Sequence, residues 1–154
     1  MKNKWYYKYD RVNLGFIEEN GAITGIFFSG GIDEGQLPRA ETPLIKRASE
    51  QLAEYFRGER KHFDFPISPS GSVFQKKVWD AVSAIPYGET RSYKDIAIQA
   101  GNPLAARAVG LANNRNPIVI VIPCHRVVGH DGSLTGYGGG LDIKEYLLNI
   151  EKQP

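Results

Sequence analysis

The sequence predicts an α+β protein made of two small domains, and three observations support this prediction. The first forty residues are rich in β-branched and aromatic side chains, and residues 65–71 are rich in proline, serine and glycine. The rest of the chain shows helical spacing of its apolar residues. With 154 residues, of which 42% are hydrophobic, the chain is long enough to bury a core.

The N-terminal part is predicted to form strands at residues 5–7 and 22–28 and then a helix at 43–56. Both strand segments consist largely of β-branched and aromatic residues, and an Asn-Gly turn signal at 20–21 precedes the second. In the helical segment, apolar residues recur every three or four positions, and Gly58 supplies a stop.

Two capping boxes predict where the next helices begin. Ser72 stands three residues before Gln75, and Ser92 stands three residues before Asp95. In such pairs each side chain hydrogen-bonds the other residue's backbone N–H, which starts a helix. The second of these helices is expected to end near Gly101.

A third helix is predicted at residues 104–113, with Asn102 as its N-cap and Pro103 at its first position. Together with the helix before it, this segment has the form of a helix-turn-helix. The domain that contains it is expected to be mainly α. Arg107 lies on the second helix among small residues. It is either a solvated surface residue or a side chain that enters a nucleic-acid groove.

The C-terminal end of the chain alternates strand, loop and helix signals. A β-branched run at 118–122 predicts a buried strand, residues 129–140 form a glycine-rich loop, and a last helix follows. The apolar face of that helix consists of Ile143, Tyr146, Leu147 and Ile150.

Composition excludes several classes of protein. A single cysteine excludes an intramolecular disulfide and any zinc site with two thiolates from one chain, so we expect no metal. The net charge of +2 is too small to indicate nucleic-acid binding by itself. No apolar run approaches a membrane span or a signal peptide, so we expect a cytoplasmic monomer without a membrane partner.

The most chemically distinctive segment is Cys124 followed by His125 and Arg126. Two basic side chains next to a thiol are expected to favour the thiolate, which is the nucleophilic form. His125 could take the thiol proton through a bridging water if a carboxylate orients its ring. The alternative is a buried cysteine with a purely structural role.

The glycine-rich loop offers a second kind of site. Residues 136–140 lack the spacing of dinucleotide or Walker motifs, which excludes nucleotide binding. We expect this backbone to line a pocket and to offer N–H groups to a ligand.

The hexapeptide at 122–127, IPCHRV, resembles the active-site signature of the O6-alkylguanine-DNA alkyltransferases. Other segments are similar to the same family in order and spacing, so that the resemblance covers residues 72–152. They are 74–79 (FQKKVW), 85–93 (IPYGETRSY), 101–110 (GNPLAARAVG), Asn116-Pro117 and 136–151.

The resemblance implies a ribonuclease-H-like N-terminal domain at 1–65, a linker at 66–71 and a DNA-binding, alkyl-transferring domain at 72–154. It implies DNA repair by irreversible, stoichiometric transfer of an alkyl group from O6-alkylguanine to Cys124, without a cofactor. The partner is then double-stranded DNA carrying the lesion, and O4-alkylthymine is a further candidate substrate.

The resemblance also implies roles for individual residues. In the catalytic group, Glu151 orients His125, which deprotonates Cys124 through water. Tyr93, with Lys144, assists the leaving base at N3, and Asn116 supports the turn beside the thiol. The implied substrate pocket consists of Val127, Tyr137 and Gly138, in which the backbone of Cys124 and Val127 reads the exocyclic amine of guanine.

For DNA, the resemblance implies a helix-turn-helix that enters the minor groove and flips the damaged base. Arg107 fills the vacated space, and Tyr93 rotates the nucleotide. The implied DNA-binding surface consists of Arg107, Tyr93, Ser92, Ala106 and Gly110.

Three other functions remain open at this stage. A lesion-binding module without transfer activity would not need Cys124. A cysteine hydrolase would turn over many times, and a transcription factor would prefer a particular undamaged DNA sequence.

Overall fold

The computed structural model describes residues 2–29, 39–137 and 139–152 of the chain. The fold is a mixed α+β arrangement, as the sequence predicts, with a small antiparallel sheet and several helices. The chain divides into two compact units. The first comprises Met1–Ser70 and Pro117–Val119, and the second comprises Gly71–Asn116 and Ile120–Pro154.

The first unit is built on a three-stranded antiparallel meander of β1 (Lys2–Lys8), β2 (Asn13–Glu19) and β3 (Ala22–Phe28). The sequence prediction located β1 and β3 but missed β2, whose glycine and two glutamates weaken the strand pattern. The predicted turn between β2 and β3 is confirmed, with Asn20 at φ 53° and Gly21 at φ 83°.

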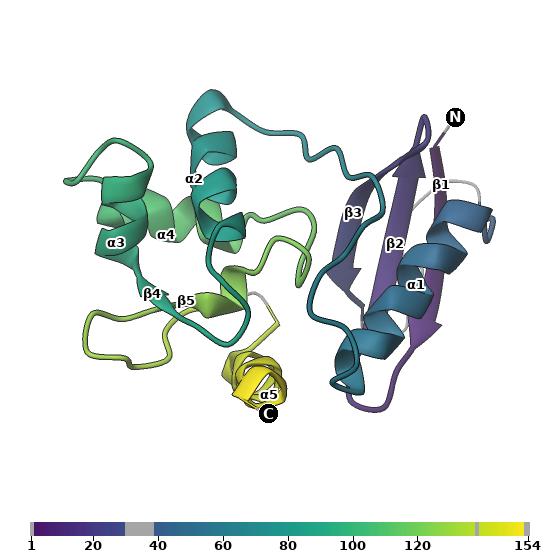
Figure 1. The fold of residues 1–154 in the computed structure, drawn as a ribbon. Helices are drawn as coiled ribbons and strands as arrows, with labels where there is room; N and C mark the ends of the chain where they lie inside the picture. Colours follow the sequence, from purple (N-terminus) through teal and green to yellow (C-terminus); the bar gives the residue numbers. More distant parts are fainter. Residues whose placement is uncertain (1, 30–38, 138, 153–154) are drawn as a thin grey trace. The chain divides into compact units, whose positions relative to one another are not determined.

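Helix α1 (Pro43–Phe56) lies across this sheet, as Figure 1 shows. The Thr42 hydroxyl caps its first turn by accepting a hydrogen bond from the Ile45 N–H, and Gly58 at φ 75° follows its end. Fully buried side chains from the sheet and the helix form the core of the unit: Leu14, Phe16, Ile23, Ile26, Ile45, Leu52 and Tyr55.

The segment leading to Cys124 is not the continuous strand predicted at 118–122. The Ile26 N–H donates to the Pro117 carbonyl and the Val119 N–H donates to the Ile26 carbonyl, so only this short stretch pairs with β3. At Ile120 the backbone turns with φ 73°, an unusual value for a β-branched residue. This turn ends the strand and redirects the chain towards Cys124.

The second unit contains α2 (Val73–Ser83), α3 (Tyr93–Gln99), α4 (Ala106–Asn114) and α5 (Leu141–Lys152). Helices α2, α3 and α4 pack against one another (Figure 1). Two short parallel strands, β4 (Arg91–Ser92) and β5 (Val127–Val128), join the segment before α3 to the one after Cys124. Both predicted capping boxes are confirmed at the starts of α2 and α3.

The prediction that Asn102 caps the third helix is wrong. The Asn102 side chain accepts from the Leu104 N–H, and its carbonyl accepts from the Ala105 N–H, which closes a separate turn. Helix α4 therefore begins only at Ala106, with Ala105 in the N-cap position and no side-chain cap.

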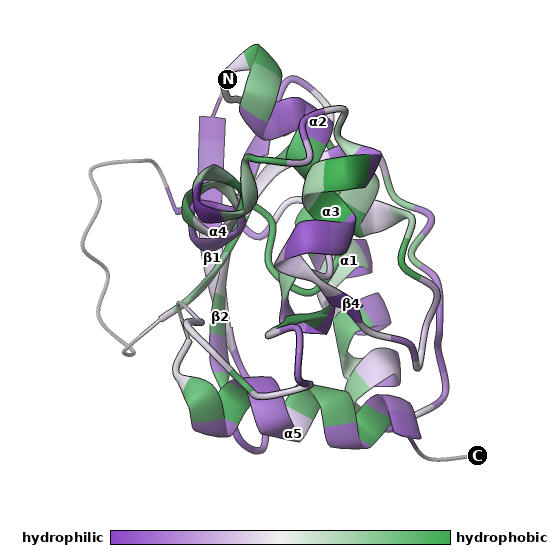
Figure 2. Ribbon diagram, turned by 90° about the vertical axis from the view of Figure 1, so that its left-hand side faces the viewer, coloured by the Kyte–Doolittle hydropathy of each residue, from purple (hydrophilic) through white to green (hydrophobic). Residues whose placement is uncertain are grey.

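Helix α5 has an amphipathic surface, visible as alternating polar and apolar bands in Figure 2. Its buried face contains Leu147, Leu148 and Ile150, but also Lys144 and Glu151. These two charged side chains lie seven residues apart and therefore share one face of the helix. Among the residues described, none of the helices has the length and apolar character needed to cross a membrane.

Candidate active site around Cys124

Cys124 begins a short 3-10 turn, Cys124–Arg126, rather than continuing an extended strand. Its side chain is buried, with 3% exposure. The Asn116 carboxamide Nδ2 lies 3.0 Å from Cys124 Sγ and 2.7 Å from the Ile122 carbonyl oxygen. One side chain therefore holds both the thiol and the backbone that leads to it.

Burial raises the pKa of the Cys124 thiol. Hydrogen bonds with Asn116 and Tyr137 and the charge of Lys144 act in the opposite direction but are smaller. The expectation that the neighbouring basic side chains favour a resting thiolate is therefore wrong. The thiol is protonated at rest, and a base must remove its proton during reaction.

His125 is completely buried, and its Nε2 lies 2.6 Å from Oε2 of Glu151 on α5. Burial lowers the pKa of His125 and outweighs the opposite effect of the Glu151 carboxylate. The ring is therefore neutral at rest, with its Nε2–H donated to Glu151. This tautomer leaves the lone pair on Nδ1, the nitrogen that can accept a proton.

Arg126 is the residue whose position the sequence interpretation missed. Its Nε donates to Glu151 Oε1 at 2.8 Å, its Nη2 lies 3.2 Å from Oε2, and its Nη1 donates to the Ile85 carbonyl at 2.7 Å. The guanidinium thus pairs with the Glu151 carboxylate and the Ile85 carbonyl rather than with the thiol. The 3-10 turn at Cys124–Arg126, which the sequence analysis did not predict, directs the side chain this way.

Lys144 is buried on α5, and its ammonium joins β5 to the loop at Thr135. It donates to the Val127 carbonyl at 2.5 Å and to the Thr135 carbonyl at 2.9 Å. Burial lowers its pKa to about 8. The Thr135 hydroxyl in turn donates to the Tyr93 hydroxyl at 3.0 Å. Sequence reasoning did not identify Thr135, because a single threonine in a glycine-rich loop carries no distinctive pattern.

The residues expected to bind DNA lie on α3 and α4, except Ser92, which ends β4 just before α3. Tyr93 is the first residue of α3, and its ring packs near Gly110 of α4. A Cβ atom added to Gly110 would lie 3.8 Å from the Tyr93 ring. Ala106 and Gly110 are partly buried on α4, whereas Arg107 is exposed. Ser92 caps α3 by accepting from the Asp95 N–H.

The expected pocket residues are only partly described. Val127 is fully buried, and its carbonyl accepts from Lys144. Tyr137 is partly buried, and its ring lies 6.0 Å from Lys144 Nζ. Gly138 lies outside the described residues. Within 2–29, 39–137 and 139–152, we find no group of histidine, cysteine and acidic side chains that could hold a metal ion.

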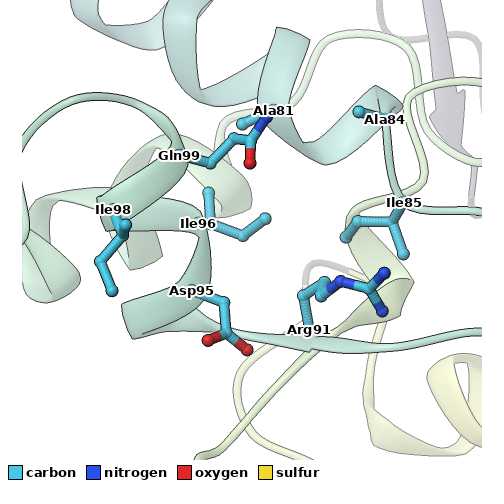
Figure 3. A pocket seen from close by; sticks show the side chains of 8 residues that line it. All are labelled: Ala81, Ala84, Ile85, Arg91, Asp95, Ile96, Ile98 and Gln99. Atoms are coloured by element: carbon cyan, nitrogen blue, oxygen red, sulfur yellow. The ribbon is translucent and has the colours of Figure 1, made fainter.

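A separate cavity of about 450 Å³ lies beside α2 and α3 and does not include the Cys124 site. Figure 3 shows its lining, which includes Arg91, Asp95 and Ile98. The two charged groups already have partners, because Arg91 pairs with Glu89 and Asp95 caps α3.

Residues 73–153 match the family model described as "6-O-methylguanine DNA methyltransferase, DNA binding domain". A methylated-DNA–protein-cysteine methyltransferase from Methanosarcina acetivorans is 62% identical over 108 residues, which cover 70% of this chain and 69% of that protein. The constitutive methylated-DNA–protein-cysteine methyltransferase of Bacillus subtilis is 48% identical over 157 residues, covering 96% and 95%.

Similarity extends to solved structures. The crystal structure of Mycobacterium tuberculosis OGT in complex with DNA has a TM-score of 0.90 and 42% sequence identity, covering 97% of this chain and 92% of that one. A family model that spans more than half of the chain thus agrees with a full-length relative and with a close structural match. The chain belongs to the O6-methylguanine-DNA methyltransferase family.

Proposed function

We propose that this protein repairs DNA by irreversible transfer of a methyl or other alkyl group from O6 of guanine to Cys124, once per molecule. The arrangement of Cys124, His125 and Glu151 is the observation that carries the proposal. A buried thiol is followed in the chain by a neutral imidazole that donates one N–H to a carboxylate. O4-alkylthymine is a second candidate substrate.

In the proposed reaction, Nδ1 of His125 takes the thiol proton through a bridging water while Glu151 holds the resulting imidazolium. The sulfur forms a bond to the alkyl carbon, and the bond from that carbon to O6 breaks. The electron pair passes into the guanine ring, where Tyr93 supplies or shares a proton at N3. No cofactor takes part in these steps.

The structure supports a positioning role for Lys144 rather than direct proton donation to the base. Its ammonium holds the carbonyls of Val127 and Thr135, and the Thr135 hydroxyl reaches Tyr93. Lys144 therefore acts on the leaving base through Thr135 and Tyr93. Its charge also favours the thiolate that forms during transfer.

We further propose that α3 and α4 form a helix-turn-helix that enters the minor groove of double-stranded DNA. Arg107 is exposed on α4 and would fill the space left by the flipped base, while Tyr93 at the start of α3 would turn the nucleotide. A flipped base is required because O6 is inaccessible within the duplex. The DNA complex of the M. tuberculosis relative supports a DNA partner.

We propose that the protein acts as a monomer and that residues 1–65 form a ribonuclease-H-like domain without catalytic activity. Residues 66–71 then serve as the linker to the DNA-binding part at 72–154.

Intact-mass spectrometry tests the transfer directly. After incubation with a duplex that contains O6-methylguanine, the protein should gain the mass of one methyl group, located by peptide mapping at Cys124. The amount of guanine restored should equal one equivalent of protein. Absence of the mass gain would contradict transfer to the protein. Restoration of more than one equivalent of guanine would contradict stoichiometric transfer and would favour a cysteine hydrolase.

A further inference from the structure

The IPYG segment after α2 is a motif to which the catalytic scheme assigns no role, although it touches the buried ion pair behind His125 at three points. The Ile85 carbonyl accepts from Arg126 Nη1 at 2.7 Å. The Gly88 N–H donates to Glu151 Oε1 at 3.3 Å. Between these two residues in the chain, the half-buried ring of Tyr87 lies with its centroid 5.6 Å from Arg126 Cζ.

The conformation of Gly88 fixes this segment against α5. Its φ is 83°, and a Cβ added there would lie 3.2 Å from the Glu151 carbonyl oxygen. Both features favour glycine. The Tyr87 hydroxyl lies 3.5 Å from the Ile150 carbonyl oxygen, which is too long for a strong hydrogen bond. The aromatic ring, rather than the hydroxyl, is therefore the part of Tyr87 that matters for the ion pair.

Tyr87 gives Arg126 a kind of contact that its other partners do not. The hydrogen bonds of a guanidinium lie in its own plane, and those of Arg126 go to Glu151 and Ile85. The face of an aromatic ring instead attracts a cation through its quadrupole and excludes water from the side that it occupies. The Arg126 side chain is accordingly only 8% exposed.

We propose that Tyr87 is a positioning residue for the catalytic base, whose ring holds the Arg126 guanidinium on Glu151 and so keeps His125 neutral and able to accept the thiol proton. The inference rests on the proposed alkyl transfer, because it concerns the base of that reaction. Tyr87 acts through Arg126 and Glu151 and touches neither the substrate nor the sulfur.

The charges around His125 explain why the position of Arg126 matters. Burial has the largest effect on the pKa of His125 and lowers it; Glu151 raises it, and Arg126 and Lys144 lower it further. A guanidinium that moves away or becomes hydrated lowers this pKa less, so the pKa rises. A protonated imidazole cannot take the thiol proton, so transfer then slows most at low pH. Helix α2 also packs against the turn, and its charged residues are all exposed: Lys76, Lys77 and Asp80.

The test measures single-turnover rate constants of methyl transfer from a saturating duplex with O6-methylguanine, between about pH 5 and 8, where histidine titrates. Tyr87→Leu should lower the rate at the acid end by about 2- to 5-fold, the effect of one partly exposed cation–π contact, and approach the wild-type rate towards pH 8. Tyr87→Phe keeps the ring and should stay within about twofold of wild type at every pH.

Tyr6→Leu is the matched control. Tyr6 is also half-buried, and Arg39 Cζ lies 5.4 Å from its ring centroid, so the substitution removes the same kind of contact. This pair belongs to the first unit, which contains neither His125 nor Glu151. The ratio of its rate to that of wild type should therefore be the same at every pH.

A second measurement needs neither DNA nor transfer. In an NMR titration of the free protein, the His125 imidazole should stay neutral to a lower pH in wild type and Tyr87→Phe than in Tyr87→Leu. It reports on the base directly.

A rate ratio of Tyr87→Leu to wild type that is constant across the pH range would overturn the proposal, because the ring would then serve only stability. Equal losses in Tyr87→Phe and Tyr87→Leu would overturn it as well. If wild type is not methylated at all, the alkyl transfer itself is refuted. The titration then decides the role of Tyr87, and identical behaviour of His125 in all variants would exclude it.

Discussion

The guanidinium of Arg126 and the carboxylate of Glu151 form a two-pronged ion pair, with Nε to Oε1 at 2.8 Å and Nη2 to Oε2 at 3.2 Å. The same carboxylate accepts from His125 Nε2 at 2.6 Å and from the Gly88 N–H at 3.3 Å. The Glu151 side chain is 1% exposed, and both of its carboxylate oxygens are thereby paired. Glu151 can remain ionised in the interior because Arg126 compensates its charge.

Replacing Arg126 by leucine should therefore destabilise the protein strongly. Removing one partner of a buried ion pair costs about 3–5 kcal/mol, because the other charge stays buried without compensation. Urea denaturation of Arg126→Leu measures this loss of unfolding free energy. Arg91→Leu is the control, since it removes an arginine–glutamate pair of which the side chains are 40% and 53% exposed. The control should lose no more than about 1 kcal/mol, and equal losses would show that burial does not govern the effect.

The same substitution should change the acid–base behaviour of His125. The charge of Arg126 lowers the pKa of His125, in addition to the larger effect of burial. Without it, the uncompensated carboxylate should draw a proton onto the ring and raise the pKa of His125. An NMR titration of the imidazole in wild type and Arg126→Leu tests the direction. A charged histidine cannot act as a base, so transfer near neutral pH should slow as well.

Much of the local structure could be predicted because it depends on neighbouring residues. The capping boxes of Ser72 and Ser92 are contacts across three positions, and the turn between β2 and β3 follows from an asparagine–glycine pair. Patterns of this range are visible in a sequence. The family of the chain could also be recognised, because its motifs occur in order along residues 72–152.

The parts that could not be predicted depend on contacts between distant segments. The run at 118–122 has strong strand propensity, but the backbone turns at Ile120 after pairing briefly with β3. That turn and the 3-10 turn after it decide that Arg126 meets Glu151 rather than the thiol. The deep burial that raises the pKa of Cys124 likewise comes from the folded surroundings, which a tripeptide motif does not specify.

The hydrogen bond from Thr135 to Tyr93 predicts that Thr135 positions the phenol for the leaving base. The Thr135 hydroxyl donates to the Tyr93 oxygen at 3.0 Å, and the Tyr93 hydroxyl lies 3.5 Å from the Thr135 carbonyl oxygen, so this residue holds the phenol through both contacts. Thr135→Val keeps the branched shape but removes this donor, and we expect transfer from DNA to slow by about 2- to 10-fold, the effect of one hydrogen bond. Thr135→Ser keeps the hydroxyl and should restore most of the rate. Equal losses in the two variants would show that the methyl group, not the hydrogen bond, matters.

The lowered pKa of Lys144 predicts a pH dependence of stability. Its pKa falls from 10.5 to about 8 on folding, so between these values the unfolded chain binds the extra proton. Stability linked to this group therefore rises as the pH rises from about 8 to 10.5, and its cost is fully present below pH 8. The difference in unfolding free energy between wild type and Lys144→Met should shift in favour of wild type across this interval. Lys152→Met, at an exposed position on the same helix, serves as the control, and an equal shift there would refute the assignment.

The distance in sequence and role between the thiol and the proposed DNA-binding helices, α3 and α4, predicts that catalysis and DNA binding can be separated. Cys124→Ala should abolish transfer and leave affinity for a duplex with O6-methylguanine largely intact, since the proposed DNA contacts lie on α3 and α4 and not on the buried thiol. Arg107→Ala should weaken duplex binding but leave the reaction with free O6-benzylguanine nearly unchanged. Fluorescence anisotropy measures the first property, and intact-mass spectrometry the second. Loss of DNA binding in folded Cys124→Ala would contradict this separation.

Alkylation of Cys124 should itself destabilise the protein. The sulfur is buried and accepts from Asn116 Nδ2 at 3.0 Å, so an added methyl group must be accommodated in a packed site next to this contact. Overpacking of a buried site costs about 1–3 kcal/mol, which for a chain of this size lowers the melting temperature by roughly 2–10 °C. Because Asn116 also holds the Ile122 carbonyl, displacement of its side chain should loosen the backbone before Cys124 and the end of α4. Calorimetry of the protein before and after quantitative methylation measures the shift, with mock-treated Cys124→Ala as the control. An unchanged melting temperature would mean that the pocket accommodates the methyl group without moving Asn116.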